Sequence, residues 1–366
     1  MAQSGLPRVL FVVRPDASTR YGGDTKLARD TFEAVSALGI SAEFVETDRP
    51  DPRGFDLAHV FNVGQPDVCA RQMDACEVAG VPVVLSPVWL DLREFFGKAA
   101  AYERLFLTAR SPARVEAALA RYATWDADRF LNGRQRRDLR QRLAAQTALL
   151  KRAAVLVPNS AIEARDCLVQ LGVRERPFVI VQIPAGTESE SSWREEKRGL
   201  IAIGRIETRK NQTGLLYGVR DDAFDVDLVG AAYHQELAEA CLRWCPRARM
   251  HGRLPRDRML ELLGKAEVHA LVSWCETAGI ATMEAAIAGA KIVVADRGAE
   301  VEYYGDDAEY ADPADPKSIR DAVRRAFARP PRRRGDTLDL RMRRYTWQQA
   351  ATETLRAYRM AWSSTG

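Results

Sequence analysis

Two glutamates, Glu276 and Glu284, lie at the start of a segment that is expected to form a helix, Ala278–Ala288. Short apolar runs of strand length flank this helix, Val268–Val272 before it and Lys291–Ala295 after it, so the pattern is strand, glycine-bearing turn, helix and strand. Glu276 precedes the helix and Glu284 lies about two turns into it, because roughly eight residues at about 1.5 Å each span about 12 Å. Carboxylates at that separation can accept hydrogen bonds from two points of one elongated ligand.

The start of this helix is also suited to an anion. In a βαβ unit the helix N-terminus lies at the carboxyl edge of a parallel sheet, where free N–H groups and the helix dipole favour an anion such as a diphosphate. Gly279 lets a ligand approach the backbone, and its neighbours complete the candidate site: Thr277, Ala278, Ile280 and Ala281. Glu276 could then contact a sugar, and Glu284 could accept hydrogen bonds from both ribose hydroxyls. Taken in isolation, the pair would more often be two solvated glutamates at a helix end.

This stretch, ETAGIATME, resembles the family 4 retaining glycosyltransferases of GT-B fold (glycosyl transferases group 1), whose C-terminal domain carries a Glu, seven residues and a second Glu. The resemblance continues in GRIETRKNQ from Gly204 and HGRLPRDRMLELLGKAEV upstream, and in GAEVEYYGDDAEYADPADPKSI and YTWQQAATETLRAY downstream. These segments follow the family's order and cover most of the C-terminal half. The resemblance implies an α/β chain with two Rossmann-like domains facing an interdomain cleft, and a C-terminal helix that packs back on the first domain.

The resemblance also implies how a donor would be held. Arg205 and Lys210 follow the strand that ends at Gly204, and they match the Arg and Lys that grip the donor diphosphate in the family. Two cations after a strand are otherwise common surface residues. The six cysteines and four histidines form no zinc-like cluster. We therefore expect cationic side chains in place of a divalent ion, and no cofactor besides the nucleotide sugar as co-substrate.

The first half of the chain has the pattern of a doubly wound α/β domain. The run Arg8–Val13 is unbroken and apolar, as in a buried parallel strand. Further short strands are expected at Ala42–Val45, Leu57–Phe61 and Pro82–Leu85, separated by helical stretches such as Asp67–Ala79. This alternation is typical of a parallel sheet covered by helices.

Five residues of this half are candidates for the cleft or for binding an acceptor. Gly22 and Gly23 precede an expected helix, where they can cradle a phosphate or admit an acceptor, although an ordinary glycine loop is an equal alternative. His59 resembles a family histidine near the cleft, but a lone histidine on an apolar strand is more often a core residue. Many relatives place a histidine after the PVVLS-type strand, where this chain has SPVW and then an aspartate. Ser86 and Asp91 are therefore candidates to replace it.

The segment from Arg93 to Arg152 is helical in pattern and rich in arginine. Between Arg129 and Arg152 there are eight basic residues and one acid, Asp138. A solvated helix face is the commonest fate of such a run, followed by a face that binds anionic lipid and then one that binds nucleic-acid phosphates. The net charge of +4 is too small to indicate a nucleic-acid-binding protein, and no nucleic acid is expected as a partner.

The length of 366 residues and an apolar content of 46% are sufficient for two domain cores. The polar run Gly186–Arg198 has the composition of an interdomain linker. We predict an acceptor-side domain over residues 1–190 with an arginine-rich helical insertion, and a nucleotide-sugar-binding domain over residues 191–344. Residues 345–366 are predicted to form a helix that returns to the first domain, with an apolar face at helical spacing made of Trp347, Ala351, Leu355, Tyr358 and Trp362.

The function implied by the resemblance is transfer of a sugar, with retention of configuration, from a UDP- or GDP-linked donor to a hydroxyl of a glycan or lipid-linked acceptor. Family habit suggests bacterial surface polysaccharide or glycoconjugate synthesis as the context. A nucleotide-sugar epimerase of GT-B fold, or a non-catalytic protein that binds nucleotides or polyanions, are the alternatives. No apolar run approaches the roughly 20 residues of a membrane span. We expect a cytoplasmic protein, with at most peripheral contact with an anionic membrane surface.

Overall fold

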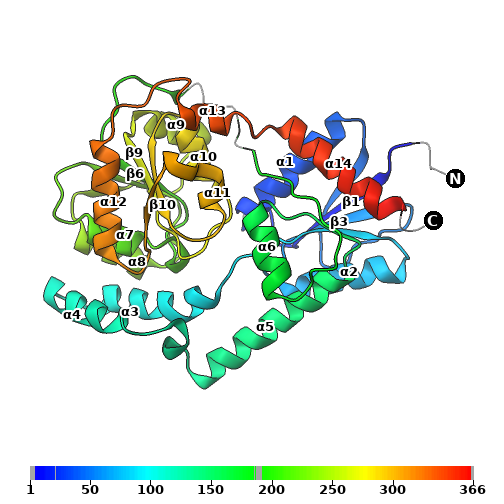
Figure 1. The fold of residues 1–366 in the computed structure, drawn as a ribbon, viewed down its shortest axis with the longest axis horizontal. Coiled ribbons are helices and arrows are strands. Elements are labelled where there is room, and N and C mark those ends of the chain that lie inside the picture. Colours follow the sequence, from blue (N-terminus) through cyan, green and yellow to red (C-terminus); the bar gives the residue numbers. More distant parts are fainter. Residues whose placement is uncertain (1–4, 21, 185, 187–191, 364–366) are drawn as a thin grey trace. The chain divides into compact units, whose positions relative to one another are not determined.

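The computed structural model describes residues 5–20, 22–184, 186 and 192–363. The chain forms two compact units, each an α/β assembly around a parallel sheet (Figure 1). The first unit consists of Met1–Leu90, Asp138–Pro184 and Tyr345–Gly366, and the second of Asp91–Arg137 and Ala185–Arg344. The predicted linker, residues 186–198, includes residues 187–191, which lie outside the described part of the chain.

The sheet of the first unit has five parallel strands in the order β2-β1-β3-β4-β5. Its strands are β1 (Arg8–Val13), β2 (Ser41–Glu46), β3 (Leu57–Phe61), β4 (Val83–Ser86) and β5 (Val155–Leu156). β1 pairs with β2 on one side and β3 on the other, so the strand order reverses between β1 and β3. The carboxyl ends of two such strands form a topological switch point, where open α/β sheets bind their ligands.

Helices cover both faces of this sheet (Figure 1). They are α1 (Gly23–Ala37), α2 (Pro66–Val78), α5 (Gly133–Arg152, of which residues 138–152 belong to this unit), α6 (Ala161–Gln170) and α14 (Trp347–Ser363). The main core lies between the strands and α2, α5 and α6. α14 packs against α1 and against β3, β4 and β5, and Ala351, Tyr358 and Ala361 are buried on one of its faces. The C-terminal helix therefore returns to the first domain, as predicted.

The second unit has a six-stranded parallel sheet in the order β11-β10-β9-β6-β7-β8. Its strands are β6 (Leu200–Ile203), β7 (Val226–Val229), β8 (Ala248–Met250), β9 (Val268–Leu271), β10 (Lys291–Ala295) and β11 (Glu309–Ala311). β6 pairs with β7 on one side and with β9 on the other, so this sheet has its switch point between β6 and β9. The prediction of two Rossmann-like domains is confirmed.

The helices of the second unit divide between the sheet and a helical extension. Over the sheet lie η4 (Thr208–Lys210), α7 (Gln212–Gly218), α8 (Gln235–Trp244), α9 (Arg256–Lys265), α10 (Ile280–Ile287), α11 (Glu300–Tyr304), η5 (Gly305–Asp307), α12 (Pro316–Ala328) and α13 (Thr337–Met342). The extension holds η1 (Phe95–Ala99), α3 (Ala100–Thr108), α4 (Pro112–Tyr122) and η2 (Ala127–Phe130). α7, α8 and α12 share the main core with the strands, while α10 packs on β9, β10 and α13.

Residues 91–137 differ from the predicted domain division, because they pack with the second unit and not as an insertion in the first. The ring of Phe106 on α3 lies 5.3 Å from that of Tyr217 on α7, between ring centroids. Trp244 Nε1 on α8 donates a hydrogen bond of 2.9 Å to the carbonyl of Phe106. The aromatic side of α3 thus buries apolar surface of α7 and α8, and the many arginines of this segment do not indicate that contact.

Among the described residues, no helix combines the length and the apolar character that crossing a membrane would require.

Candidate functional site

The predicted donor residues lie around the switch point of the second sheet. Gly204 follows β6 directly, and the turn from Glu276 to Gly279 follows β9 and leads into α10. The 3-10 helix η4, which holds Lys210, comes after Gly204 on the same edge. Because β6 and β9 are paired neighbours and parallel, these loops meet at one edge of the sheet.

Glu276 is the acidic residue around which the basic side chains at this edge of the sheet gather. Lys210 Nζ contacts Glu276 Oε2 directly, and Arg209 Nη1 lies 3.7 Å from the same oxygen. Burial alone would raise the pKa of Glu276, but the charges of Lys210 and Arg209 outweigh it and lower the pKa to about 2. Glu276 is therefore a carboxylate with two cations at one oxygen. The structure brings together Glu276 and Lys210, both predicted from the sequence.

Arg209 is a member of this cluster that the sequence analysis missed. Its guanidinium donates hydrogen bonds to the Cys275 carbonyl at 3.2 Å and to Glu207 Oε1 at 3.0 Å. Burial alone would lower the pKa of Arg209, but the charges of Glu276 and Glu207 raise it above its ordinary value. Arg205 lies 3.4 Å from Glu207 and is more exposed. The segment RIETRK contains three cations, and only the fold shows that Arg209, rather than Arg205, joins Lys210 at Glu276.

Helix α10 starts at the glycine expected to admit a ligand. Gly279 has φ of +63°, in the left-handed region, and its carbonyl accepts the N–H groups of Thr282 and Met283 at 2.8 and 3.0 Å. A Cβ at residue 279 would lie 3.1 Å from Thr282 Oγ1 and 3.2 Å from Glu300 Oε1. Since the first N–H groups of an α-helix have no partner within the helix, Ile280 and Ala281 supply donors here.

Glu284 lies in the second turn of α10, as its spacing predicts, and is almost wholly buried. Arg256, the first residue of α9, binds both carboxylate oxygens: Nη1 donates to Oε2 at 2.9 Å, and Nη2 lies 2.8 Å from Oε1. Oε1 accepts no well-aligned hydrogen bond among the described residues. Arg256 belongs to the segment HGRLPRDRMLELLGKAEV, whose resemblance to the family is noted above, yet its pairing with Glu284 was not predicted.

At the switch point of the first sheet, Asp24 joins the ends of two strands. Arg14, just after β1, donates from Nε to Asp24 Oδ2 at 3.1 Å, and Asn62, just after β3, donates from Nδ2 to the same oxygen at 2.9 Å. Burial alone would raise the pKa of Asp24, but these two donors lower it. Gly22 and Gly23 lie directly before Asp24 at the start of α1, at this same edge. Asn62 takes a left-handed conformation, with φ of 73°.

His59 and Ser86, two of the acceptor candidates, are buried and bound within the core. His59 Nδ1 lies 2.8 Å from the Tyr358 hydroxyl, and Nε2 lies 2.9 Å from Ser86 Oγ. Burial lowers the pKa of His59 to about 3, so the imidazole is neutral. Both side chains link β3 and β4 to α14, and neither is exposed for an acceptor to contact. Asp91, another of the acceptor candidates, follows β4. It lies in the second unit and forms an ion pair with Arg93.

The loop after β4 is instead held by a buried acid that the sequence analysis did not single out. Glu163 accepts the N–H groups of Trp89 and Asn159, both at 2.7 Å. Its own N–H donates a hydrogen bond of 2.8 Å to Ser160 Oγ, so Ser160 is the N-cap of α6. Burial raises the pKa of Glu163 to about 7. Val88 in this loop has φ of 46°, a strained value for a β-branched residue.

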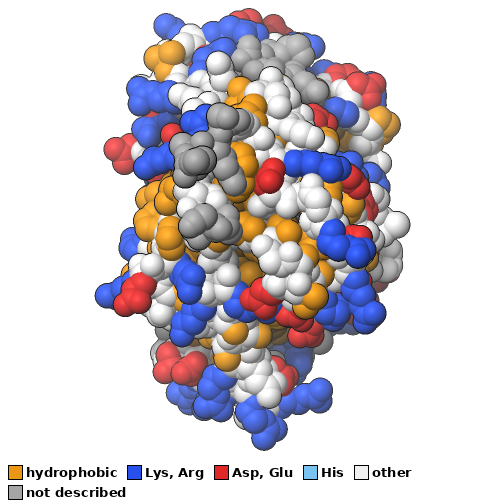
Figure 2. Space-filling view, turned by 90° about the vertical axis from the view of Figure 1, so that its right-hand side faces the viewer, with side chains coloured by type: hydrophobic (Ala, Val, Ile, Leu, Met, Phe, Trp, Pro, Cys, Tyr) orange, Lys and Arg blue, Asp and Glu red, His pale blue; other side chains and the backbone are white. Residues whose placement is uncertain are grey.

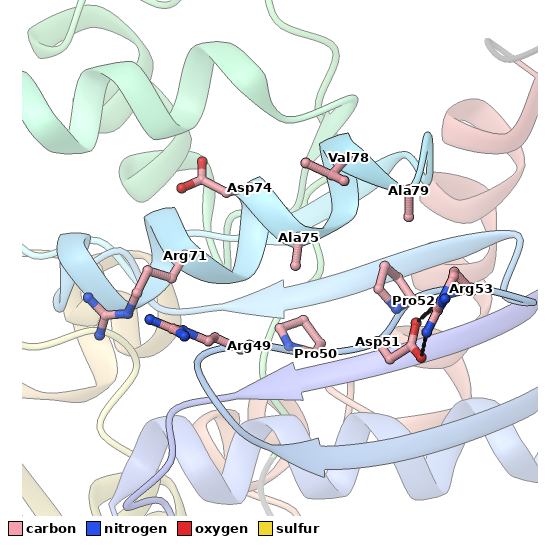
Figure 3. A pocket seen from close by; sticks show the side chains of 10 residues that line it. All are labelled: Arg49, Pro50, Asp51, Pro52, Arg53, Arg71, Asp74, Ala75, Val78 and Ala79. Atoms are coloured by element: carbon pink, nitrogen blue, oxygen red, sulfur yellow. Dashed lines mark hydrogen bonds and ion pairs between the residues drawn. The ribbon is translucent and has the colours of Figure 1, made fainter.

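A shallow surface pocket of about 640 Å³ lies in the first unit, between α2 and the loop joining β2 to β3 (Figure 3). In Figure 3, Arg53 and Asp51 are bound to each other at one end of this pocket, and Val78 of α2 is among its lining residues. The pocket contains none of the residues predicted for the donor or acceptor.

Residues 187–339 match the family model described as Glycosyl transferases group 1. This match lies within the second unit, which is therefore similar to a glycosyl transferases group 1 domain. This domain holds every residue predicted for the donor, from Gly204 to Glu284. No curated protein matches the sequence of this chain significantly.

Solved structures match the fold over nearly the whole chain. Sucrose-phosphate synthase from Thermosynechococcus elongatus superposes with a TM-score of 0.71 at 14% identity, over 98% of this chain and 100% of that one. AviGT4, a glycosyltransferase involved in avilamycin A biosynthesis, gives 0.61 at 15% identity, over 98% and 99%. HepE from Anabaena, in complex with UDP-glucose, gives 0.58 at 14% identity, over 98% and 97%. These superpositions establish a GT-B fold, and together with the match to the group 1 family model they support a glycosyltransferase, as predicted.

Proposed function

We propose that this chain is a retaining glycosyltransferase that moves a sugar from a UDP- or GDP-linked donor to a hydroxyl of a glycan or lipid-linked acceptor. The observation that carries the proposal is the cluster of Glu276, Lys210 and Arg209 beside the N-terminus of α10, at the switch point of the group 1 domain. HepE, which shares the fold, was solved with UDP-glucose, and that supports a nucleotide-sugar donor.

In this proposal the donor diphosphate binds the start of α10 together with Arg205 and Lys210. The bond between the anomeric carbon and the diphosphate oxygen breaks, and its electron pair passes to that oxygen. Cations and N–H groups fixed in place stabilise the charge that develops there. The acceptor oxygen bonds to the anomeric carbon on the same face, and its proton passes to the departing phosphate oxygen.

Lys210 has two partners in this scheme. In the unliganded chain it contacts Glu276, so an incoming diphosphate competes with a carboxylate for the same ammonium group. Arg209 lies 3.7 Å from that carboxylate and still balances its charge if Lys210 turns to the phosphate. Glu276 can then accept hydrogen bonds from the hydroxyls of the donor sugar while remaining ionised.

Glu284 is the proposed ligand of the ribose hydroxyls. Arg256 occupies one edge of its carboxylate, which fixes the orientation of the group. Each carboxylate oxygen has two acceptor sites, so a ribose can bind while the arginine remains in position. Gly279, Thr277, Ala278 and the first residues of α10 line the backbone side of this proposed site.

On the acceptor side, we propose that the start of α1 at Gly22 and Gly23 receives the acceptor in the first unit. This edge carries the Arg14, Asp24 and Asn62 cluster at the switch point of the first sheet. His59 and Ser86 serve core packing in this proposal and do not contact the acceptor, because both side chains are bound within the protein.

We further propose that the enzyme works without a divalent ion and acts at an anionic membrane surface in building a bacterial surface glycan. The basic residues of the first half of α5 support the membrane contact, since four arginines there are exposed: Arg134, Arg136, Arg137 and Arg140. On the face in Figure 2, basic side chains are instead scattered among acidic and apolar ones.

Sedimentation with vesicles of anionic and of neutral lipid tests the proposed membrane contact. A chelator added to a transfer assay tests whether the enzyme needs a divalent ion.

The donor site is tested by thermal unfolding with UDP, GDP and ADP, on the wild type, Glu284→Ala and Glu261→Ala. Glu261 is a control because it is partly exposed and its ion pairs, with Arg258 and Lys265, both lie within α9. A ligand at about 100 times its dissociation constant stabilises a protein by about 2.7 kcal/mol. One nucleotide should raise the midpoint of the wild type and of Glu261→Ala, but not of Glu284→Ala.

The alternatives give different outcomes. If polyanions stabilise the wild type and no nucleotide does, the chain is a binding protein and the donor proposal fails. If a nucleotide binds, sugar donors screened with simple alcohols separate a transferase from an epimerase. A transferase forms a new glycoside, whereas an epimerase returns an altered nucleotide sugar.

A further inference from the structure

Glu300 is a buried acid whose carboxyl group accepts no hydrogen bond among the described residues. It is the first residue of α11, and none of its surface is exposed. Neither of its carboxyl oxygens has a hydrogen-bond partner among the described residues. Burying a polar group without a partner costs free energy, and an ionised carboxylate costs far more than a neutral one. Such a group in a native fold calls for an explanation, and functional sites are a common one.

The carboxyl group of Glu300 faces the turn that begins α10. Its Oε1 lies 3.2 Å from the position that a Cβ of Gly279 would occupy. One helical turn later on α11, the Tyr304 hydroxyl donates a hydrogen bond of 2.7 Å to the Ala278 carbonyl. A Cβ at Gly298, just before α11, would lie 2.5 Å from the Glu276 carbonyl. The start of α11 and the residues before it therefore support the whole turn from Glu276 to Gly279.

The charges around Glu300 favour its neutral form. Burial raises its pKa well above the ordinary value of 4.5, the charge of Glu276 raises it further, and Lys210 acts in the opposite direction. The phenols of Tyr304 and Tyr310 also lie near Glu300, and burial raises the pKa values of both phenols. Glu276 itself remains charged down to about pH 2.

Both nearby cations are already engaged by Glu276. Lys210 contacts its Oε2, and Arg209 lies 3.7 Å from the same atom. A second carboxylate at residue 300 would have no cation of its own and would compete for Lys210. It would also place negative charge beside the helix terminus that is to receive an anion, cancelling part of the attraction of the free N–H groups and the helix dipole.

We propose that Glu300 is a positioning residue of the donor site that works as a neutral acid, supporting the Gly279 turn while leaving Lys210 and the N-terminus of α10 free to bind a nucleoside diphosphate. The inference rests on the proposed function of this site. Loss of the proton from Glu300 introduces a second negative charge beside Glu276 and weakens binding. The affinity for the diphosphate thus falls as pH rises through the titration of Glu300.

The test is calorimetric titration of the full chain with UDP, GDP and ADP between about pH 6 and about pH 10. A unit charge a few ångströms from an anion, at an effective dielectric constant of about 20, changes affinity by about tenfold or more. The dissociation constant of the wild type should therefore rise about tenfold across this range. In Glu300→Gln, which is neutral at every pH, that rise should disappear and binding at pH 6 should be retained. The ligand's own titration is identical in both proteins.

Glu302→Gln is the matched control, because it removes one acid from the same helix at a partly exposed position and should keep the profile of the wild type. The infrared carbonyl band of a protonated carboxylic acid gives a second measurement. Glu163, whose pKa is about 7, contributes a band of its own that fades near that pH. A further band, present in the wild type at pH 6 and fading as the affinity falls, is expected for Glu300 and tests the inference even if Glu300→Gln does not fold. Equal pH profiles for wild type and Glu300→Gln, or a flat profile for the wild type, overturn this inference and leave the proposed function intact. Failure of the wild type to bind any of the three nucleotides at any pH overturns both.

Discussion

Lys210 forms an ion pair with Glu276 across the switch point of the second sheet, joining the loop after β6 to the turn after β9. The two residues are 66 positions apart in the sequence. Their side chains are only 13% and 9% exposed, so the pair is largely shielded from water. A pair in this setting holds two loops together and keeps a cation ready beside the helix terminus that is suited to an anion.

Replacing Lys210 by alanine should weaken binding of the nucleoside diphosphate by about tenfold to a hundredfold, because a charge-assisted contact to phosphate contributes about 1.5–3 kcal/mol. Arg209 keeps Glu276 paired, so the variant should still fold. Calorimetric titration measures the change. Lys265→Ala, which removes an exposed lysine of α9, is the control and should bind as the wild type does. Unchanged affinity in Lys210→Ala would remove the lysine from the site.

Glu276 should make stability depend on pH in the acid range. A carboxyl whose pKa is lowered in the folded protein contributes stability above its unfolded value, and that contribution is lost as pH falls toward the folded value. For Glu276 the window runs from about 4.5 down to about 2, and the contribution is on the order of 3 kcal/mol. Denaturant unfolding from about pH 3 to about pH 7 should show a smaller acid loss in Glu276→Gln than in the wild type. Glu43→Gln, at an exposed site on β2, should keep the wild-type slope.

The donor helix could be predicted because its signals are local. The apolar runs that became β9 and β10, the glycine before α10 and the spacing of Glu276 and Glu284 are all read within one βαβ unit. The parallel pairing then follows from the alternation of strands and helices, and with it the meeting of the loops after β6 and β9.

The partners of these residues could not be predicted in the same way. Arg209, Arg256 and Glu300 reach the site from separate elements, and their side-chain directions depend on packing that the sequence does not state. His59 is bound by Tyr358, which lies 299 positions away, so the sequence could favour a core role for His59 but could not identify its partner. Residues 91–137 were assigned to the first domain because they precede the linker-like run 186–198, whereas their buried aromatic rings determine where they pack.

Gly279→Ala tests whether the turn before α10 needs glycine for two reasons. The left-handed φ of +63° costs an L-residue about 1–2 kcal/mol, and the added Cβ would also crowd Thr282 and Glu300. Gly80 provides a matched control, since its φ is +69° but no atom lies within 4 Å of an added Cβ. Denaturant unfolding should show a larger loss for Gly279→Ala than for Gly80→Ala. Only the former should reduce nucleotide binding, and equal effects of the two would show that crowding at the turn is unimportant.

Tyr358→Phe tests the structural role of His59. The Tyr358 hydroxyl lies 2.8 Å from His59 Nδ1, and both residues are wholly buried, so removing it leaves a ring nitrogen without a partner. That loss should destabilise the first unit by about 1–3 kcal/mol. Unfolding in denaturant measures it, and Tyr233→Phe, at an exposed position, should cost much less. Because the bond holds α14 to β3 within the core, the affinity for the nucleotide and the Michaelis constant for the acceptor should stay the same. A variant with normal stability but a raised Michaelis constant for the acceptor would return His59 to the binding site.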